Sequence, residues 1–275
     1  MESTTAFPGS ARNDAPRPKG TAWLLVSPAA DGATNMAIDE ALLRRAGQTG
    51  ETVFRVYAWA TPTVSLGRNQ PGRGCYDLDV ARARGIDFVR RLTGGRAILH
   101  HHEITYAVAS PVSAYGSLPE SYRTINRLLL EALRTLGVDA REAQASTRAP
   151  APSIAPCFDA PVTGELVAEG RKLVGSAQVR DGGAFLQHGS ILLEDDQQLL
   201  AEMLVDREPS PSPATLRALT GRLVTVQEFA DALAASVALH DGRTPRMLEL
   251  GEPLLDDVRS LVPTRYALAD WTWRR

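Results

Sequence analysis

The chain has 275 residues, 44% of them hydrophobic and 23% charged, and its formal net charge is −2 at pH 7. This composition is typical of a soluble globular protein, and the nearly balanced charge argues against nucleic acid as a partner. No apolar run approaches the roughly 20 residues that a membrane-spanning helix requires, and no secretory leader is visible. We therefore expect a cytoplasmic protein with reduced cysteines and no membrane partner.

The first elements are a leader, a strand and a helix. Residues 1–20 mix proline, glycine, serine and charged residues without an apolar core, which predicts a disordered leader. The apolar run 22–27 predicts a buried strand. A helix follows, with Thr34 as its expected N-cap, and helical spacing places Asp39 and Glu40 on its solvated face.

Short apolar runs at 53–59 and 63–66 predict two further strands. Asp77 begins a short predicted helix, and a strand at 86–89 follows it. This strand leads into residues 90–106, where the alternation of apolar and polar residues stops. The chain is therefore expected to change from regular structure to a specialised loop at this point.

That loop contains Gly94 and Gly95, with Arg90, Arg91 and Arg96 around them. Adjacent glycines let a backbone approach a group that side chains would exclude. Such a basic turn could hold a carboxylate, a phosphate or a carbonyl oxygen. The structural alternative is a plain β-turn between strands, and the residues alone leave both interpretations open.

The triplet His100, His101 and His102 suggests a metal site, but the spacing argues against one. Neighbouring side chains on a strand point to opposite faces, so three consecutive histidines cannot converge on one ion. His100 and His102 could share a face, yet no further ligand spacing completes a site. We therefore predict no metal, with one histidine in a pocket and the others in solvent or core.

Residues 117–137 form the clearest predicted helix, with a capping box at Ser117 and Glu120 and an apolar stripe. The segment 143–161 is rich in proline, alanine and serine and predicts a loop. It carries Cys157, whose neighbours Pro156 and Phe158 indicate a pinned, partly enclosed position.

Lys172 is unusual because 28 of the 30 basic residues are arginine. It is the only lysine outside the leader, and it lies on the second strand of a hairpin predicted across Gly170. Lysine differs from arginine as a compact charge whose pKa falls readily on burial. We interpret Lys172 as a functional ammonium that could stabilise a thiolate at Cys157; a solvated lysine and a buried structural cysteine are the alternatives.

A strand at 184–193 carries His188 and Gly189 in its middle, where a glycine is tolerated if a ligand or another backbone approaches closely. The remaining chain predicts helices. We expect an α+β fold with mixed β-sheets flanked by helices, comprising a catalytic domain at 21–242 and a helical extension at 243–275 packed on it.

Several motifs resemble those of the biotin/lipoate protein ligase superfamily. They are residues 90–100 (RRLTGGRAILH), 170–178 (GRKLVGSAQ) and 188–190 (HGS), supported by 35–40 (NMAIDE), 65–68 (SLGR) and 271–275 (WTWRR). The resemblance covers about residues 22–275. The run 156–161 (PCFDAP) resembles one branch, the cysteine-dependent octanoyl-carrier-protein:protein N-octanoyltransferases.

This resemblance implies a reaction and a set of site residues. Cys157 would attack the thioester of octanoyl-acyl carrier protein, and the octanoyl group would pass to a lysine of a lipoyl domain or of glycine cleavage H protein. Lys172 would be the second catalytic residue. The reaction would require no ATP, no other cofactor and no metal. The residues implied to bind substrate are Arg91, Gly94, Gly95, His100, Gly175, Ser176, Ala177, Gln178, His188 and Gly189.

Two other functions compete with this one. An ATP-dependent lipoate-protein ligase of the same superfamily would activate a free acid and be indifferent to Cys157. A non-catalytic module would bind an acyl group or a partner without transferring anything.

Overall fold

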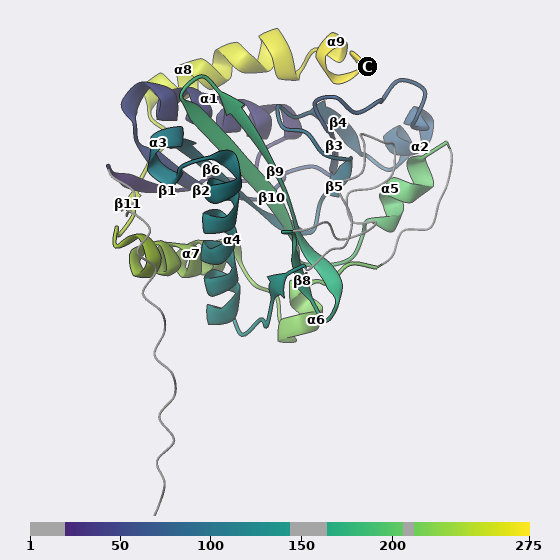
Figure 1. Cartoon of the computed structure of the whole chain (residues 1–275). Coiled ribbons are helices and arrows are strands. Elements are labelled where there is room, and N and C mark those ends of the chain that lie inside the picture. The colour runs from purple at the N-terminus through teal and green to yellow at the C-terminus, as the bar shows by residue number, and fades with distance from the viewer. Residues whose placement is uncertain (1–19, 144–163, 206–211) are drawn as a thin grey trace, which may run out of the picture.

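A large mixed sheet runs through the centre of the protein in the computed structural model, which describes residues 20–143, 164–205 and 212–275 (Figure 1). Its strand order is β11-β1-β2-β6-β10-β9-β8-β7. The strands are β1 (Ala22–Val26), β2 (Thr52–Tyr57), β6 (Glu103–Pro111), β7 (Arg141–Glu142), β8 (Leu166–Ala168), β9 (Arg171–Asp181), β10 (Ala184–Leu192) and β11 (Arg246–Met247). β1 pairs in parallel with β2 and β11, and the pairs from β2 through β7 are antiparallel.

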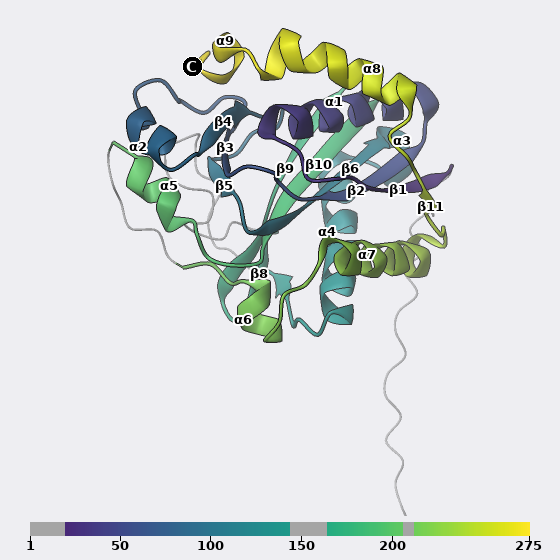
Figure 2. The ribbon, with the colours of Figure 1, turned by 180° about the vertical axis from the view of Figure 1, so that it is seen from behind.

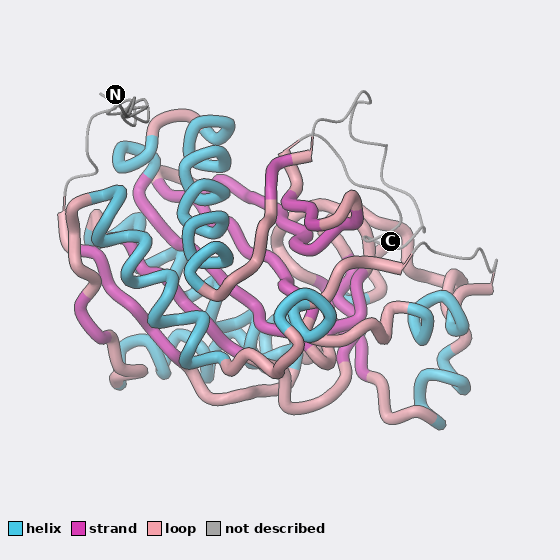
Figure 3. Tube along the Cα trace, turned by 90° about the horizontal axis from the view of Figure 1, so that it is seen from below, coloured by secondary structure: helices cyan, strands magenta, loops and turns pink. Residues whose placement is uncertain are grey.

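Helices cover both faces of this sheet. The helices are α1 (Gly32–Thr49), α2 (Leu78–Ala83), α3 (Val112–Tyr115), α4 (Leu118–Thr135), α5 (Gln198–Met203), α6 (Leu216–Thr220), α7 (Val226–Asp241), α8 (Glu252–Leu261), the π-helix η1 (Val262–Tyr266) and α9 (Ala269–Thr272). α4 and α7 pack on one face, and α1 on the other (Figure 2). Figure 3 views the molecule from the side of α4 and α7. Two separate apolar cores therefore lie on either side of the sheet.

A second, three-stranded sheet lies beside the first. It has the order β4-β3-β5, with β3 (Thr63–Leu66), β4 (Asp87–Arg90) and β5 (Ile98–His100). α2 and α5 pack against it in a third apolar core. The loop between β4 and β5 holds the glycine pair, so the small sheet positions this loop at the edge of the large one.

The predicted α+β class and the predicted strands at 22–27, 53–59, 63–66 and 86–89 are confirmed. The long helix predicted at 117–137 is α4, and its Ser117–Glu120 capping box is present. The predicted leader lies outside the described residues, apart from Gly20. Among the helices that the structure describes, none is long and apolar enough to span a bilayer.

The prediction for the first helix was wrong in two respects. Its N-cap is Asp31, whose side chain accepts a hydrogen bond from the Thr34 backbone N–H at 2.8 Å. Asp39 and Glu40 are not solvated but 1% and 4% exposed. Asp39 faces the sheet, where it contacts Arg55 and His188, whereas Glu40 faces η1, where Tyr266 contacts it. Because α8 and η1 pack on the outer side of α1, the helix has almost no solvent-facing surface along these turns (Figure 2).

Candidate active site

Lys172 lies on β9, directly after a tight hairpin turn. Glu169 and Gly170 form the turn with φ values of 50° and 74°, and Ala168 pairs with Arg171 across it. Positive φ at both central residues is typical of the turn type whose twist matches that of the paired strands. The hairpin predicted across Gly170 is thereby confirmed.

The Lys172 side chain is buried, with the residue only 3% exposed, and its Nζ donates a hydrogen bond to Glu165 Oε1 at 2.6 Å. A buried ammonium is costly unless an anion accompanies it, and Glu165 supplies that anion just before β8. The alternative of a solvated lysine is therefore wrong. Cys157, the expected neighbour, lies outside the described residues, and its pairing with Lys172 stays a prediction.

The strands β9 and β10 bring most of the predicted substrate-binding residues together. Gly189 pairs with Ser176, and His188 with Ala177, in adjacent positions of the antiparallel register. A Cβ atom added to Gly189 would lie 2.5 Å from the carbonyl oxygen of Gly175 and 2.7 Å from the Tyr106 ring. The mid-strand glycine is therefore required by the close approach of another backbone and an aromatic ring.

Tyr106 on β6 joins this group, although it was not predicted as a site residue. Its hydroxyl is 2.7 Å from Ser176 Oγ and accepts a hydrogen bond from Gln187 Nε2 at 2.9 Å. The amides of Gln187 and Gln178 hydrogen-bond at 2.7 Å. Burial raises the pKa of Tyr106 to about 12, so the phenol is neutral and available as a donor at neutral pH. These side chains form a continuous polar strip on the sheet.

The glycine loop is held by Arg91. Its guanidinium donates to the carbonyl oxygens of Ser65 at 2.8 Å, Gly94 at 2.8 Å and Arg96 at 2.7 Å. Gly95 has a φ of 90°, which disfavours any residue with a side chain. Arg91 thus fixes the shape of the loop through backbone carbonyl oxygens of the chain itself, and the binding of a ligand group by this basic turn stays a prediction.

Gly67 shows why the loop needs a bare backbone. A Cβ atom on Gly67 would lie 2.0 Å from the carbonyl oxygen of Gly95. By contrast, a Cβ on Gly94 would meet no described atom within 4 Å. One side of the loop is thus packed against the segment after β3, and the other side has room beside Gly94.

His188 belongs to a buried chain of polar groups that reaches the same loop. Its Nδ1 is 2.8 Å from Asp39 Oδ2, and its Nε2 is 2.7 Å from Thr93 Oγ1. Asp39 also forms an ion pair of 2.7 Å with Arg55, which is fully buried. The chain therefore links α1 and β2, through β10, to the residue that precedes Gly94.

The surroundings shift both pKa values of this pair downward. Burial raises the pKa of Asp39, but Arg55 and His188 together outweigh it and hold the pKa below its ordinary value. Burial also lowers the pKa of His188, and this effect exceeds the opposing influence of Asp39. At neutral pH the pair is therefore a carboxylate hydrogen-bonded to a neutral imidazole that donates from Nδ1, so its Nε2 accepts the Thr93 hydroxyl proton.

His100 forms a second chain of the same kind. Its Nε2 is 2.7 Å from Ser65 Oγ, and its Nδ1 is 2.8 Å from Glu103 Oε1. The imidazole stacks on Trp59 with ring centroids 3.9 Å apart. Ser65 in turn accepts a hydrogen bond from Arg91 at 3.0 Å, so His100 supports the glycine loop through Ser65 and Arg91.

Sequence reasoning missed the acidic members of these chains. Asp39 and Glu103 lie within segments that carry the family resemblance, but periodicity alone assigned Asp39 to solvent. The signal that could have identified them is the pairing of each with a histidine, which joins segments far apart in the sequence. Thr93 and Ser65 were missed for the same reason.

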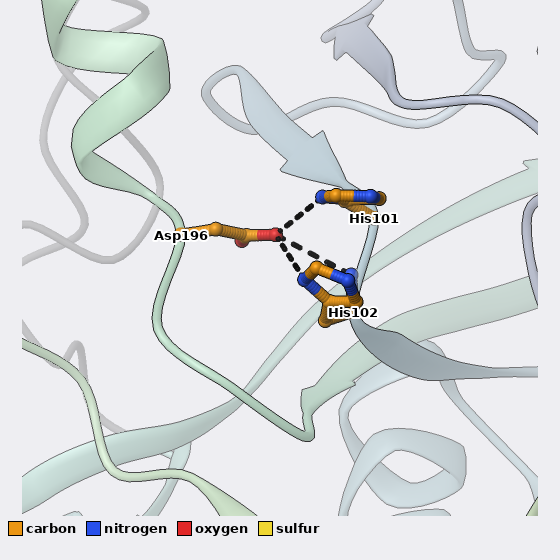
Figure 4. A group of neighbouring side chains, drawn as sticks. All are labelled: His101, His102 and Asp196. Atoms are coloured by element: carbon orange, nitrogen blue, oxygen red, sulfur yellow. Dashed lines mark hydrogen bonds and ion pairs between the residues drawn. The ribbon is translucent and has the colours of Figure 1, made fainter.

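The three consecutive histidines have different environments in the structure. His100 ends β5 and points into the buried chain, as the prediction of one histidine in a pocket requires. The expectation that its neighbours point to opposite faces was wrong, because His101 and His102 lie in the turn after β5 and not on a strand. Their rings are 3.7 Å apart, and both approach Asp196 (Figure 4).

Comparisons with known proteins identify the family and the fold. A family model described as lipoyl protein ligase A/B catalytic domain matches residues 31–238. An octanoyltransferase LipM from Kyrpidia tusciae is 39% identical over 262 residues, which cover 88% of this chain and 95% of the relative. One from Symbiobacterium thermophilum is 39% identical over 263 residues, with 89% and 95% covered. A crystal structure of lipoate-protein ligase A bound with ATP has a TM-score of 0.77 at 23% identity, and the match covers 92% of this chain and 99% of that one.

The fold and the matched region define the class of protein first. The chain belongs to the lipoyl protein ligase A/B catalytic domain family, within the biotin/lipoate protein ligase superfamily. Inside this family it is a LipM-like member, and hence an acyltransferase. The family resemblance found in the sequence motifs is thereby confirmed, and the relatives are octanoyltransferases, whereas the dependence on Cys157 stays a prediction.

Proposed function

We propose that this enzyme transfers an octanoyl group from octanoyl-acyl carrier protein to a lysine of a lipoyl domain or of glycine cleavage H protein. Octanoyl transfer in lipoate biosynthesis follows from the LipM relatives, which cover most of the chain. The donor, the acceptors and a thioester intermediate on Cys157 are our proposals. The observation that carries the mechanism is the buried Lys172 ammonium on β9, in the same strand as the polar strip.

The first step forms the acyl-enzyme. The Cys157 thiolate attacks the thioester carbonyl of the donor, the carbon–sulfur bond to the carrier breaks, and the carrier leaves as a thiol after taking up a proton. A free cysteine with a pKa near 8.5 is mostly protonated at neutral pH, and a nearby ammonium favours the thiolate. One thioester replaces another, so the exchange requires no ATP.

The second step forms the product. The ε-amine of the acceptor lysine attacks the Cys157 thioester, loses a proton, and releases the thiolate as the stable amide forms. In this proposal Lys172, with Glu165 beside it, keeps the sulfur ionised and assists in moving that proton. Gly94, beside which no described atom would contact an added Cβ, and the strip from Gly175 to Gln178 would border the acyl group and its thioester.

Intact-protein mass spectrometry tests the proposal. After incubation with octanoyl-acyl carrier protein, we expect the enzyme to gain the mass of one octanoyl group, and Cys157→Ala to gain none. Cys75→Ala is the matched control, since Cys75 is the other cysteine and lies among the residues of α2 and β4. We expect it to be acylated as in the wild type.

A second measurement separates transfer from ligation. Addition of a lipoyl domain should chase the octanoyl mass from the enzyme to the acceptor without ATP. Turnover that needs free octanoate and ATP and is unaffected by Cys157→Ala would instead identify a ligase. Binding of the donor with no adduct and no chase would identify a non-catalytic module.

A further inference from the structure

Three potential metal ligands meet on the surface beyond β5, outside the site described above. His101 and His102 form the turn between β5 and β6, and Asp196 lies just before α5 (Figure 4). His101 Nδ1 is 2.9 Å and His102 Nδ1 is 3.3 Å from the same carboxylate oxygen, Asp196 Oδ2. All three ligand atoms lie within 4.8 Å of one another.

These separations suit a shared metal ion. Ligands about 2.0–2.1 Å from a tetrahedral Zn²⁺ are separated from one another by about 3.3 Å. The two nitrogen–oxygen distances, 2.9 Å and 3.3 Å, are close to this ligand–ligand separation. Because all three ligand atoms lie within 4.8 Å of one another, a small rearrangement of the side chains would place them around one ion.

His101 supplies an independent observation. Its Nδ1 is buried and has no hydrogen-bond partner among the described residues, although Asp196 Oδ2 is only 2.9 Å away. The nitrogen is therefore close to the carboxylate but not aimed at it as a hydrogen bond requires. A buried polar atom without a partner costs free energy, and coordination of a metal would remove that cost.

The surrounding backbone fixes the relative positions of the two segments. Gln197, next to Asp196, exchanges two hydrogen bonds with the backbone of Leu99, at 3.2 Å and 2.8 Å. The Leu193 N–H donates to the carbonyl oxygen of His102 at 2.9 Å. The backbone of β5 and the segment just after β10 therefore hold the three ligands together, and not their own contacts alone.

We propose that His101, His102 and Asp196 form a binding site for one divalent transition-metal ion of the zinc class. Two imidazoles and one carboxylate favour zinc, nickel or copper over the oxygen-seeking magnesium and calcium. The side chains of His101 and His102 are 33% and 50% exposed, so an ion has access and water completes its coordination. The bound ion joins the β5–β6 turn to the start of α5, one residue from His100.

Cobalt spectroscopy and zinc calorimetry test this proposal on untagged protein with Cys75→Ser and Cys157→Ser, which removes thiolate binding. We expect one ion per chain and visible Co²⁺ bands of a low-coordinate nitrogen–oxygen site without thiolate charge transfer. His101→Ala with His102→Ala should weaken Zn²⁺ binding at least tenfold, and Asp196→Asn should also weaken it. An unaltered far-UV spectrum of the metal-free variants shows that they fold.

His240→Ala is the matched control, because His240 also lies on the surface near a carboxylate, 3.9 Å from Glu131. It should leave zinc affinity unchanged. A stoichiometry of zero, or equal affinity with and without the two histidines, would show that the cluster is only an ion pair between imidazole and carboxylate. Neither result depends on acyl transfer, so this test is independent of the proposed function.

Discussion

The ammonium of Lys172 is the residue-scale feature on which the proposed chemistry depends. We expect Lys172→Arg to slow acyl-enzyme formation by about 10²-fold or more, although it preserves the charge, because a planar guanidinium is larger and cannot give up a proton. The burst of octanoyl adduct measured by rapid-quench mass spectrometry reports this step. Arg171→Lys, at the exposed adjacent position, is the control and should behave as the wild type.

A second residue-scale prediction concerns pH. Unfolded His188 titrates near its ordinary pKa of about 6.5, whereas burial lowers its pKa in the folded protein. Below about pH 6.5 the unfolded state therefore binds more protons, and the free energy of unfolding falls as pH decreases toward the pKa of folded His188.

Asp39 acts in a lower pH range. Its pKa is lowered in the folded protein, so its contribution to stability is present above about pH 3.9 and is lost as pH falls through its folded pKa.

Urea unfolding of wild type and His188→Gln between about pH 7.5 and about pH 5 measures the histidine contribution. The variant should be less stable at the higher pH and should lose less stability on acidification. Parallel curves for the two proteins would contradict a neutral buried His188.

Lys172 could be singled out from the sequence because a rare residue type is visible in the composition. Asp39 was not, since its role comes from contacts with Arg55 on β2 and His188 on β10, and single-sequence periodicity contains neither contact. The same limit applies to the pairing of Glu103 with His100.

At the scale of elements, β10 depends on the absence of a side chain at Gly189. We expect Gly189→Ala to destabilise the protein by about 1–3 kcal/mol, because the added Cβ would overlap the Gly175 carbonyl and force β9 and β10 apart. Transfer activity should fall with it, since the polar strip lies across these strands. Chemical denaturation and a transfer assay measure the two effects.

Gly183→Ala is the matched control on the turn between the same strands. Its added Cβ would meet no described atom within 4 Å, and its backbone is not in the left-handed region, so stability should change little. Equal losses in both variants would assign the effect to glycine flexibility and not to the close approach at Gly189.

The elements themselves could be predicted well where each has one buried face. α4 is such a helix, and its capping box and apolar stripe gave its bounds. α1 is not, because the sheet covers one side and α8 with η1 the other, so a polar residue on it is buried whichever way it points. Its Asp31 cap was missed because Thr34 also fits the cap preference, and only the backbone shows that the helix begins three residues earlier.

At the scale of the whole molecule, the C-terminal segment completes the support of the glycine loop. Arg90, fully buried, donates from Nε to the carbonyl oxygen of Thr272 at 2.8 Å and from Nη1 to that of Gln70 at 2.8 Å. The Trp271 indole donates back to the carbonyl oxygen of Arg90 at 2.8 Å. The end of the chain thus holds the strand that leads into Arg91.

Removal of residues 269–275 should therefore act at a distance from the residues removed. Arg90 would lose the Thr272 carbonyl while keeping the carbonyl acceptors of Gly67 and Gln70, and the loss of one hydrogen bond to a charged group costs about 1.5–3 kcal/mol. We expect the truncated protein to unfold at lower denaturant concentration and to lose transfer activity as the glycine loop loosens. Asp270→Ala, an exposed change within the same segment, should leave both properties near wild type. Full stability in the truncated protein would mean that water replaces the Thr272 carbonyl, and that the glycine loop is held by Arg91, His100 and His188 alone.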